Sequence, residues 1–549
     1  MSGGEWWRGA VIYQIYPRSF QDSTGTGVGD LPGITSRLDH IAALGVDAIW
    51  LSPFFASPMK DMGYDVSDYT AVDPLFGTLS DFDALVARAH GLGLKVIIDQ
   101  VLSHSSDRHP HFAASRASRT GPKSDWYVWA DPKPDGTPPN NWTSVFGGSA
   151  WEWEPRRRQY YLHNFLREQP DWNVWNPDVQ DYLLATMRFW LERGVDGFRL
   201  DTVNYYIHDR ELRDNPPAPG LATAPLAQTP RETYGWQDHL YSKARPENLA
   251  FLKRMRALTD EYPDRMMIGE VGEHGDRAIE IMAEYTEGAD RLHLCYSFEM
   301  LGPHYEARFF RHALEKFFDG APHGHPSWSF SNHDVQRHIS RFAAHGESPG
   351  ALGRQAIALL MGFEGAIGVY QGEELGLPEA ELAYDELTDP PGLRFWPEVK
   401  GRDGCRTPMV WEATAPHGGF STTKPWLPVK PPHLTLAVDA QEAANDSLLH
   451  AYRETIGFRS SRAALRHGTT RFLDVPEPLL AFQRAAGDDT LTCIYNLSPA
   501  PCIATLGAPA TLTGPAAAQL DGLTLTLPAN GFAFLETEAP ETLTLAIAT

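Results

Sequence analysis

The chain of 549 residues carries 47 basic and 70 acidic side chains, a formal charge of −23 at pH 7. So acidic a surface is poorly suited to nucleic-acid phosphates or to an anionic membrane, and it favours a small neutral ligand. The longest apolar runs, such as 356–361, fall far short of the ~20 residues that a membrane helix needs. The composition, 42% hydrophobic and 21% charged, is that of an ordinary globular protein.

The N-terminal residues lack the basic stretch and apolar core of a secretory signal, so we expect a cytoplasmic protein. The four cysteines show no CxxC spacing, which argues against a zinc site. Cys493 and Cys502 are close enough in sequence to pair in a surface sheet, but a reducing compartment favours free thiols.

Short apolar, β-branched segments alternate with longer helical patterns along most of the chain. The predicted strands are 10–16, 46–52, 94–101, 196–203, 265–271, 293–298, 327–332 and 366–372. Continuously apolar strands are typical of a parallel sheet that is buried on both faces. Helical spacing follows a predicted Ser80 cap and recurs at 178–193 and 247–260. Eight strands with helical crossovers favour a closed (β/α)₈ TIM barrel over an open doubly wound sheet.

Three departures from this alternation predict the domain organisation. Residues 1–104 and 174–467 form the barrel domain, and 105–173 form an irregular subdomain inserted after the third strand. From 468 to 549 short alternating strands with Gly and Pro turns predict a C-terminal antiparallel β-sandwich. The stretch 373–440 after the eighth strand is too long for a plain loop, and such excursions are usually functional.

Ionisable side chains collect where four of the predicted strands end. In a barrel of this type the chemistry occurs at the carboxyl ends of the strands. One charged residue at a strand end is equally compatible with a structural salt bridge, but four strands together favour a functional site. The residues concerned are Asp99, His104, Arg199, Asp201, Glu270, His333 and Asp334.

Two of these carboxyl groups have surroundings that predict opposite pKa shifts. Arg199 and Asp201, two residues apart on a strand, project to the same side, so the guanidinium is expected to lower the pKa of Asp201. Glu270 follows the apolar run MMIG and faces other carboxylates, which is expected to raise its pKa. One ionised and one protonated carboxyl group are what glycoside hydrolysis requires. A structural ion pair remains the alternative for Arg199 and Asp201.

Several motifs occur in the order found in glycoside hydrolase family thirteen, the α-amylase family, and the chain resembles that family from Trp6 to about residue 465. The four signature-like segments are DQVLSH (99–104), GFRLDTV (197–203), GEVG (269–272) and FSNHD (330–334). Further similar segments are GVDAIWLSP (45–53), DMGYDVSDY (61–69), QPDWN (169–173) and GVYQGEELG (368–376).

The resemblance implies a role for each residue that matches the family's pattern. Asp201 would be the nucleophile, Glu270 the general acid and base, and Asp334 the stabiliser of the transition state. The reaction implied is a double displacement that retains the anomeric configuration and needs no cofactor. The pocket for the non-reducing glucose would be shaped by Asp61, Tyr64, His104, Arg199, His333 and Arg402.

The segment QPDWN resembles the oligo-1,6-glucosidase subgroup, which contains α-glucosidases acting on short substrates. In that subgroup the residue after the nucleophile is read for linkage preference, and Thr202 favours α-1,4 bonds such as that of maltose. Phe146 and Phe165 in the inserted subdomain are candidates for stacking on a sugar, although aromatic residues there equally fit its small core.

The segment DSTGTGVGD (22–30) resembles the calcium-binding loop of the same subgroup, and it lacks the spacing of a phosphate-binding loop. Threonines replace the usual amide or acidic ligands at two positions, which weakens the expected structural site. Its candidate ligands are Asp22, Thr24, Thr26, Val28 and Asp30.

The expected function is therefore a retaining exo-acting α-glucosidase, with transfer of glucose to sugar or alcohol acceptors. The partner is a small neutral sugar, with no nucleic acid and no membrane, and the protein is a monomer or a homodimer. An α-1,6-glucosidase and a sucrose- or trehalose-active relative remain alternatives. Family members that serve as transporter-associated scaffolds lose the three acids, whereas this chain keeps Asp201, Glu270 and Asp334.

Overall fold

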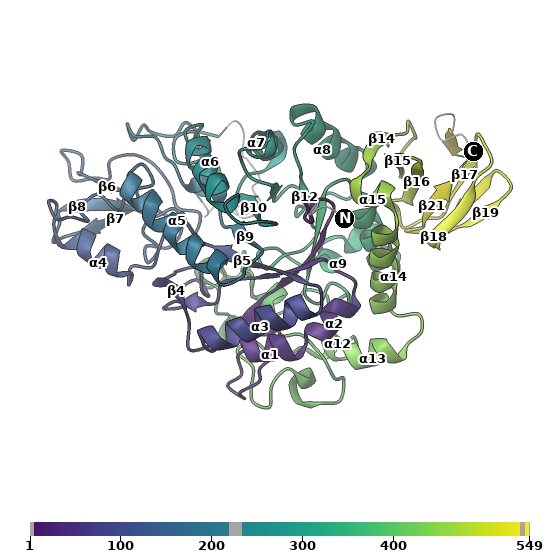
Figure 1. The fold of residues 1–549 in the computed structure, drawn as a ribbon, viewed down its shortest axis with the longest axis horizontal. Coiled ribbons are helices and arrows are strands. Elements are labelled where there is room, and N and C mark those ends of the chain that lie inside the picture. The colour runs from purple at the N-terminus through teal and green to yellow at the C-terminus, as the bar shows by residue number, and fades with distance from the viewer. Residues whose placement is uncertain (1–4, 219–232, 538–543, 548–549) are drawn as a thin grey trace.

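Eight parallel strands form the central sheet of the computed structural model, which describes residues 5–218, 233–537 and 544–547. Across the sheet they are β11 (Leu294–Ser297), β10 (Met266–Val271), β9 (Gly197–Leu200), β5 (Lys95–Gln100), β2 (Ala48–Leu51), β1 (Val11–Ile15), β13 (Ala366–Tyr370) and β12 (Ser327–Trp328). A parallel bridge between Cys295 and Pro326 brings β11 next to the start of β12. The sheet is thus nearly closed, and the predicted (β/α)₈ barrel is confirmed (Figure 1).

Helices connect the strands and cover the outside of the barrel. The longer ones are α3 (Leu79–Gly91), α5 (Pro177–Glu192), α6 (Asn248–Thr259), α7 (Gly275–Thr286), α8 (Ala307–Gly320), α10 (Pro349–Gly362) and α14 (Leu448–Ser461). The shorter ones are α1 (Leu31–Ser36), α2 (Leu38–Ala43), α9 (His338–Arg341), α11 (Pro390–Phe395), α12 (Pro431–Leu434), α13 (Val438–Ala443) and α15 (Ala463–His467). The predicted Ser80 cap was wrong, because Thr78 and Asp81 form a reciprocal capping box that starts α3 two residues earlier.

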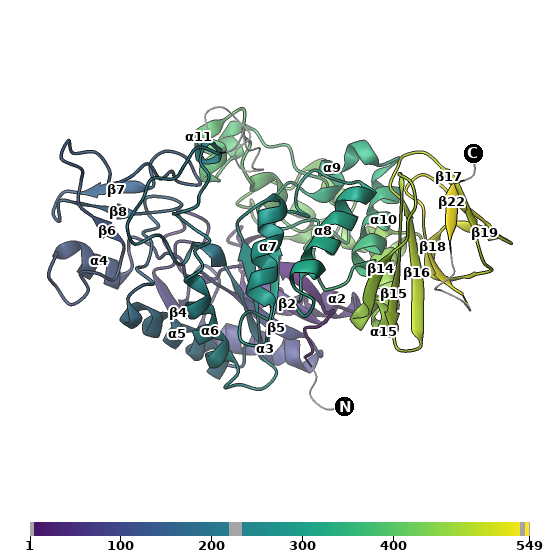
Figure 2. The same ribbon diagram turned by 90° about the horizontal axis from the view of Figure 1, so that it is seen from above.

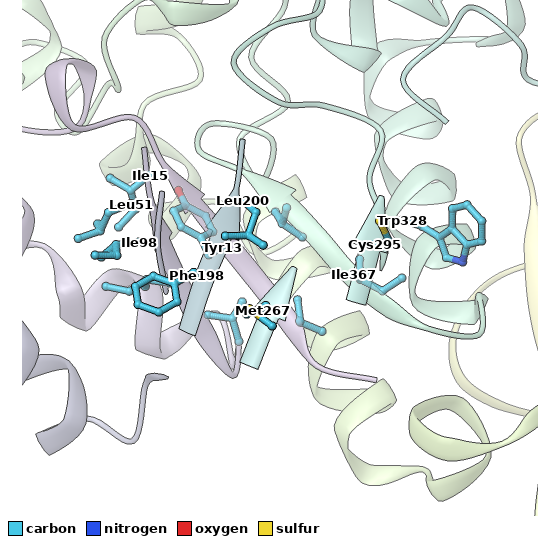
Figure 3. Packing of buried hydrophobic residues seen from close by; sticks show 14 of the residues in the cluster. Tyr13, Ile15, Leu51, Ile98, Phe198, Leu200, Met267, Cys295, Trp328 and Ile367 are labelled. Atoms are coloured by element: carbon cyan, nitrogen blue, oxygen red, sulfur yellow. The ribbon is translucent and has the colours of Figure 1, made fainter. Parts of the chain in front are cut away.

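Each barrel strand points alternate side chains to its two faces. One set meets the helices and forms the large core around the barrel (Figure 3); it includes Tyr13, Leu51, Ile98, Phe198 and Met267. The other set meets inside the barrel and includes Ile12, Trp50, Ile97, Ile268 and Tyr296. Because the period is two residues, Asp99 follows Ile97 and Glu270 follows Ile268 on the inner face.

Two predicted strands are shorter in the structure than in the sequence analysis. The strand predicted at 327–332 ends at Trp328, since Ser331 bonds to His338 and Asn332 accepts the N–H of Asp334. The strand predicted at 196–203 ends at Leu200. Thr202 there has φ of 40°, which interrupts an extended strand. Local side-chain bonds thus end these strands where the polar residues begin.

The segment between β5 and α5 contains α4 (Pro110–Ala117) and a sheet of β6 (Trp129–Ala130), β8 (Gln159–Leu162) and β7 (Trp151–Glu154). The sequence predicted an irregular insertion, and this was wrong where α4 and the three short strands form. They are too short to show a periodic apolar pattern, and α4 buries only Phe112 and Ser115. The hairpin β3 (Phe55–Ala56) and β4 (Asp68–Val72) lies in the connection after β2.

Two antiparallel sheets follow α15 and pack around a separate apolar core. One contains β14 (Thr469–Phe472), β15 (Leu479–Ala486), β16 (Asp489–Asn496), β21 (Phe532–Glu536) and β18 (Thr511–Ala517). The other contains β19 (Gln519–Asp521), β20 (Thr524–Leu527), β17 (Cys502–Leu506) and β22 (Leu545–Ile547). These sheets and the inserted segment lie at opposite ends of the molecule (Figure 2). All four cysteines are free, and among the described residues no helix has the length and apolarity to cross a membrane.

Trp190 on α5 provides a test of how the helix layer is held to the barrel. Its buried ring packs edge-on against Phe82 at 4.9 Å between centroids, and its Nε1 donates to the Tyr69 carbonyl at 2.7 Å. We expect Trp190→Ala to lower the free energy of unfolding by about 3–5 kcal/mol, measured by chemical denaturation. The control is Trp153→Ala, since Trp153 is 39% exposed. Equal denaturation midpoints for the two variants would contradict this packing.

Candidate active site

A cavity of about 250 Å³ opens at the carboxyl ends of the barrel strands. Most of the residues that the sequence analysis singled out for substrate line it. They are Asp61, Tyr64, His104, Phe146, Phe165, Asp201, Thr202, Glu270, Asp334 and Arg402. Arg199 and His333 are fully buried, and they contact the lining carboxylates.

The guanidinium of Arg199 joins three carboxylates. Its Nη1 donates to Asp99 Oδ1 at 2.8 Å and to Asp201 Oδ1 at 2.7 Å, and its Nη2 lies 2.7 Å from Glu270 Oε1. Tyr296 lies beside the same guanidinium, with its hydroxyl 2.9 Å from Nη2. One cation therefore brings together acids from β5, β10 and the end of β9.

Burial decides the protonation of these acids. It raises the pKa of Glu270 to about 8 and that of Asp201 to about 7, although Arg199 opposes both shifts. Arg199 lowers the pKa of Asp201 as predicted, but the expected net shift was wrong, because the cost of desolvation and the neighbouring Asp99 and Asp334 outweigh this attraction. Glu270 has the higher pKa, so it holds the more firmly bound proton of the pair.

Thr202 connects the two acids through its backbone. Its N–H donates to Glu270 Oε2 at 2.9 Å, and its hydroxyl lies 3.0 Å from that of Ser103. Its φ of 40° and ψ of 50° are in the left-handed region, which a β-branched residue rarely adopts. These contacts hold the residue in a strained conformation next to the reacting groups.

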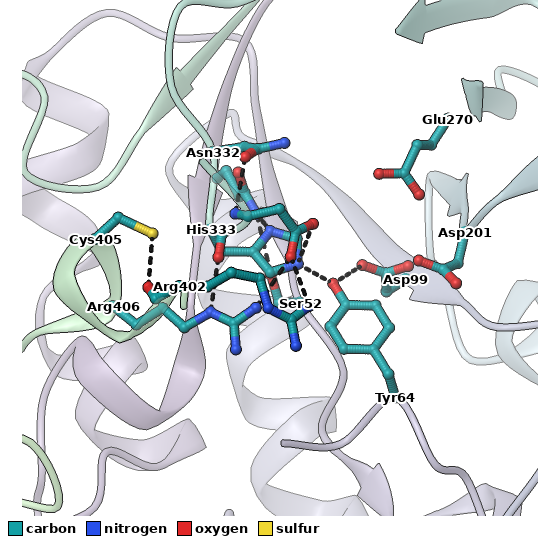
Figure 4. A network of polar contacts seen from close by, with 12 residues as sticks. Ser52, Tyr64, Asp99, Asp201, Glu270, Asn332, His333, Arg402, Cys405 and Arg406 are labelled. Atoms are coloured by element: carbon teal, nitrogen blue, oxygen red, sulfur yellow. Dashed lines mark hydrogen bonds and ion pairs between the residues drawn. The ribbon is translucent and has the colours of Figure 1, made fainter. Parts of the chain in front are cut away.

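A second cluster of opposite charges closes the other side of the cavity (Figure 4). Arg402 lies 2.8 Å from Asp61 and 3.1 Å from Asp334, and it also pairs with the buried Asp389 at 2.7 Å. Arg406 lies 3.0 Å from Asp334.

The carboxylate of Asp334 is held ionised by this cluster. Burial opposes ionisation, but His333, Arg402 and Arg406 keep the pKa of Asp334 well below its usual range. Burial also lowers the pKa of His333 far below its usual value. Since His333 is neutral at pH 7, the two guanidinium groups account for the effect under physiological conditions.

Neutral groups connect the two clusters across the floor of the cavity. Tyr64 stacks on His333 with ring planes 5° apart, and its hydroxyl lies 2.5 Å from His333 Nε2. The same hydroxyl donates to Asp99 Oδ2 at 3.2 Å. Gln14 Nε2 lies 2.7 Å from His333 Nδ1, and because an amide nitrogen only donates, Nδ1 accepts and Nε2 carries the proton.

The inserted segment contributes two aromatic rings to the cavity. Phe146 and Phe165 meet at 5.7 Å with ring planes 66° apart, and Arg402 lies 5.1 Å from the centre of the Phe146 ring. Phe165 also contacts His104, whose Nε2 lies 3.0 Å from Gln169 Nε2. These rings face the cavity as well as each other.

Sequence reasoning missed a further group of lining residues. Glu273 is the second residue after β10 and Phe298 directly follows β11, so their positions after strand ends were a usable signal. The others come from the long connection between β9 and α6, which showed no pattern. The missed residues include Tyr205, Tyr234, Lys243, Glu273 and Phe298. Asp389 was also missed, because the long stretch after β13 in which it lies showed no sequence pattern either.

The segment expected to bind calcium is stabilised by hydrogen bonds. Asp22 Oδ1 accepts the N–H of Gly25 at 2.8 Å, and its Oδ2 accepts the N–H of Gly27 at 2.7 Å and the Ser421 hydroxyl at 2.6 Å. Asp30 caps α1. Calcium needs six to eight oxygen ligands, and these carboxylates already serve protein donors. The loop is thus held in shape by protein hydrogen bonds, and among the described residues no group of three or more His, Cys, Asp and Glu side chains is placed to hold a metal ion.

The raised pKa of Glu270 makes stability depend on pH. The folded chain keeps this proton up to about pH 8, whereas the unfolded chain releases it near the ordinary value of 4.5. The folded state binds more protons between these values, so it loses stability as the pH rises. We expect the Tm of Glu270→Gln minus that of the wild type to increase from pH 5 to 8 and then level off. Glu211→Gln, at a side chain 77% exposed, is the control. A difference that is flat with pH would contradict the assignment.

Comparison with known proteins agrees with this geometry. The model of the alpha amylase catalytic domain matches residues 14–468. A probable alpha-glucosidase of Rhizobium meliloti (strain 1021) is 58% identical over 498 residues, 90% of each chain. Maltase 1 of Drosophila virilis is 38% identical over 518 residues, 90% of this chain and 78% of that protein. The structure of the alpha-glucosyl transfer enzyme XgtA has a TM-score of 0.93 at 50% identity, covering 96% of this chain and 99% of that one. The chain therefore belongs to the α-amylase family of glycoside hydrolases.

Proposed function

We propose that the protein is a retaining, exo-acting α-glucosidase that releases α-glucose from the non-reducing end of short α-1,4-glucosides such as maltose. The observation that carries the proposal is the pairing of Asp201 and Glu270 on one guanidinium, with burial giving Glu270 the higher pKa. A retaining mechanism needs such a close pair, one member ionised and the other protonated. The relatives named as an alpha-glucosidase and a maltase support the same activity.

The pKa order assigns the two roles. Asp201, ionised and hydrogen-bonded to Arg199, attacks the anomeric carbon, and Glu270 protonates the leaving oxygen. Glu270 then takes a proton from water, or from a sugar or alcohol hydroxyl, as the oxygen of that molecule attacks the anomeric carbon and breaks its bond to Asp201. Asp334 stays ionised and stabilises the positive charge that develops on the sugar ring. The similarity to XgtA, an alpha-glucosyl transfer enzyme, supports the branch in which a molecule other than water accepts the glucose.

The charged pair of Asp61 and Arg402 supports exo action. Both groups line the cavity and lie 2.8 Å apart, with Arg402 anchored by Asp389. These paired charges offer hydrogen-bond partners to the hydroxyls of one terminal glucose, and we infer that the binding site for the non-reducing end stops there. His104, Tyr64 and His333 add neutral partners, which suit an uncharged sugar.

Thr202 supports the preference for α-1,4 bonds. Its position after Asp201 places it in the cavity next to Glu270, where the leaving group must pass. A preference for α-1,6 bonds or for sucrose or trehalose is the alternative, because those substrates offer the same glucose to the same residues.

The decisive experiment follows an equimolar mixture of maltose and isomaltose by proton NMR. We expect maltose to disappear first and α-glucose to appear before its mutarotation, because the double displacement retains configuration. Isomaltose disappearing first would overturn the linkage preference, and initial β-glucose would overturn the mechanism. Asp201→Asn is expected to abolish turnover while leaving the Tm within a few degrees, and a fully active variant would overturn the mechanism. A wild type that cleaves neither these two sugars nor sucrose or trehalose would favour the scaffold alternative.

For the segment 22–30 we infer that the loop keeps its shape without calcium, because protein donors occupy both oxygens of Asp22. We expect the Tm to be the same in EDTA and in millimolar calcium chloride. A calcium-dependent rise of several degrees that Asp22→Asn abolishes would instead establish the structural calcium site.

A further inference from the structure

One wall of the cavity carries an ion pair that the proposed chemistry does not use. Lys243 is only 3% exposed, and its Nζ lies 3.2 Å from Glu273 Oε2. The same Nζ donates to the Gly272 carbonyl at 2.8 Å and to the Tyr205 hydroxyl at 3.3 Å. Both charged side chains line the cavity, so a bound molecule meets them directly.

This wall faces the leaving group of the substrate. Gly272 and Glu273 follow Glu270 along the chain, and the acid that protonates the leaving oxygen must stand on the leaving-group side of the bond. The glucose-binding groups Asp61 and Arg402 belong to the separate cluster around Asp334. The inference rests on the proposed function, since it takes Glu270 as the general acid.

The charges on this wall cancel. Although burial opposes ionisation, Lys243 and then Arg277 lower the pKa of Glu273, and Glu273 raises the pKa of Lys243, so both are ionised at pH 7. Arg277, 3.9 Å from Glu273, is itself paired with Asp238 at 2.8 Å and does not line the cavity.

The other groups on this wall are neutral. Burial lowers the pKa of His239 to about 3 and that of His274 to about 4. Tyr234 and Phe298 complete the wall with aromatic surface. Among the described residues there, no cation is left without a carboxylate to serve as partner for an anionic ligand.

We propose that Glu273, by neutralising Lys243, restricts the leaving group to uncharged sugars or alcohols and excludes phosphorylated ones. A phosphate brought against this wall would lose its hydration, and because Glu273 already neutralises Lys243, no unpaired cation there would compensate for the loss. Without Glu273 the ammonium of Lys243 is a phosphate partner already aimed into the cavity. Glu273 is thus a residue that determines specificity and does not take part in the chemistry.

The test compares kcat/KM for maltose and for maltose phosphorylated at O6 of its reducing-end glucose. The wild type is expected to prefer the neutral sugar by at least about 100-fold, because the phosphate loses its hydration without gaining a cationic partner. Glu273→Gln should narrow this preference by about tenfold or more, because it leaves Lys243 unpaired. Adding Lys243→Gln to that variant should restore the preference, since both charges are then gone.

Two controls separate charge from structure. Glu273→Asp keeps the charge and should keep the preference, whereas Asp238→Asn removes a nearby carboxylate outside the cavity and should leave the ratio unchanged. Equal use of both sugars by the wild type, or an unchanged ratio in a folded Glu273→Gln, would overturn the inference. Failure of the wild type to cleave maltose at all would instead overturn the proposed function.

Discussion

The active site depends on one buried cation. Asp99, Asp201 and Glu270 stand almost completely out of water, and such a group of carboxylates is unstable unless a counter-charge is present. Arg199 supplies it from β9, between β5 and β10, with Asp99 as its direct register partner on β5. One positive charge cannot balance three negative ones, so a proton remains, and the pKa order places it on Glu270. Acid–base chemistry requires that the two carboxyl groups differ in protonation. This difference arises because a single buried guanidinium cannot neutralise three buried carboxylates.

The second half of the site is built from loops, and this gives it a different character. Arg402 meets Asp61 and Asp334 although 341 and 68 residues separate them in the chain. Such contacts exist only because the excursion after β13 returns over the mouth of the barrel. In the proposed function, this half binds the sugar, whereas the half on the strands carries out the reaction. A rigid strand framework suits the groups that need fixed geometry, and loops suit the groups that set which sugar enters.

Sequence reasoning succeeded where a residue's position follows from a local period. The two-residue alternation of a strand predicted Arg199 and Asp201 on one side, where a hydrogen bond joins them. The family motifs selected Asp201, Glu270 and Asp334, which line one cavity. Sequence reasoning failed where short-range bonds compete with the period. Thr78, in place of Ser80, caps α3, and the turn at Asn332 ends β12 early. The inserted sheet and α4 were missed because strands of at most four residues and a helix of about two turns are too short to show a periodic apolar pattern.

The sequence by itself determined the barrel, the strand ends at which the ionisable groups collect, and the pairing of Arg199 with Asp201, because each depends on neighbours a few residues apart. Only the tertiary structure decided how deeply these groups are buried, and burial reversed the pKa shift expected for Asp201. Tertiary structure alone also brought Asp389 to Arg402 and Lys243 to Glu273. Burial and long-range ion pairs arise from the packing of distant segments, whose meeting no local spacing encodes.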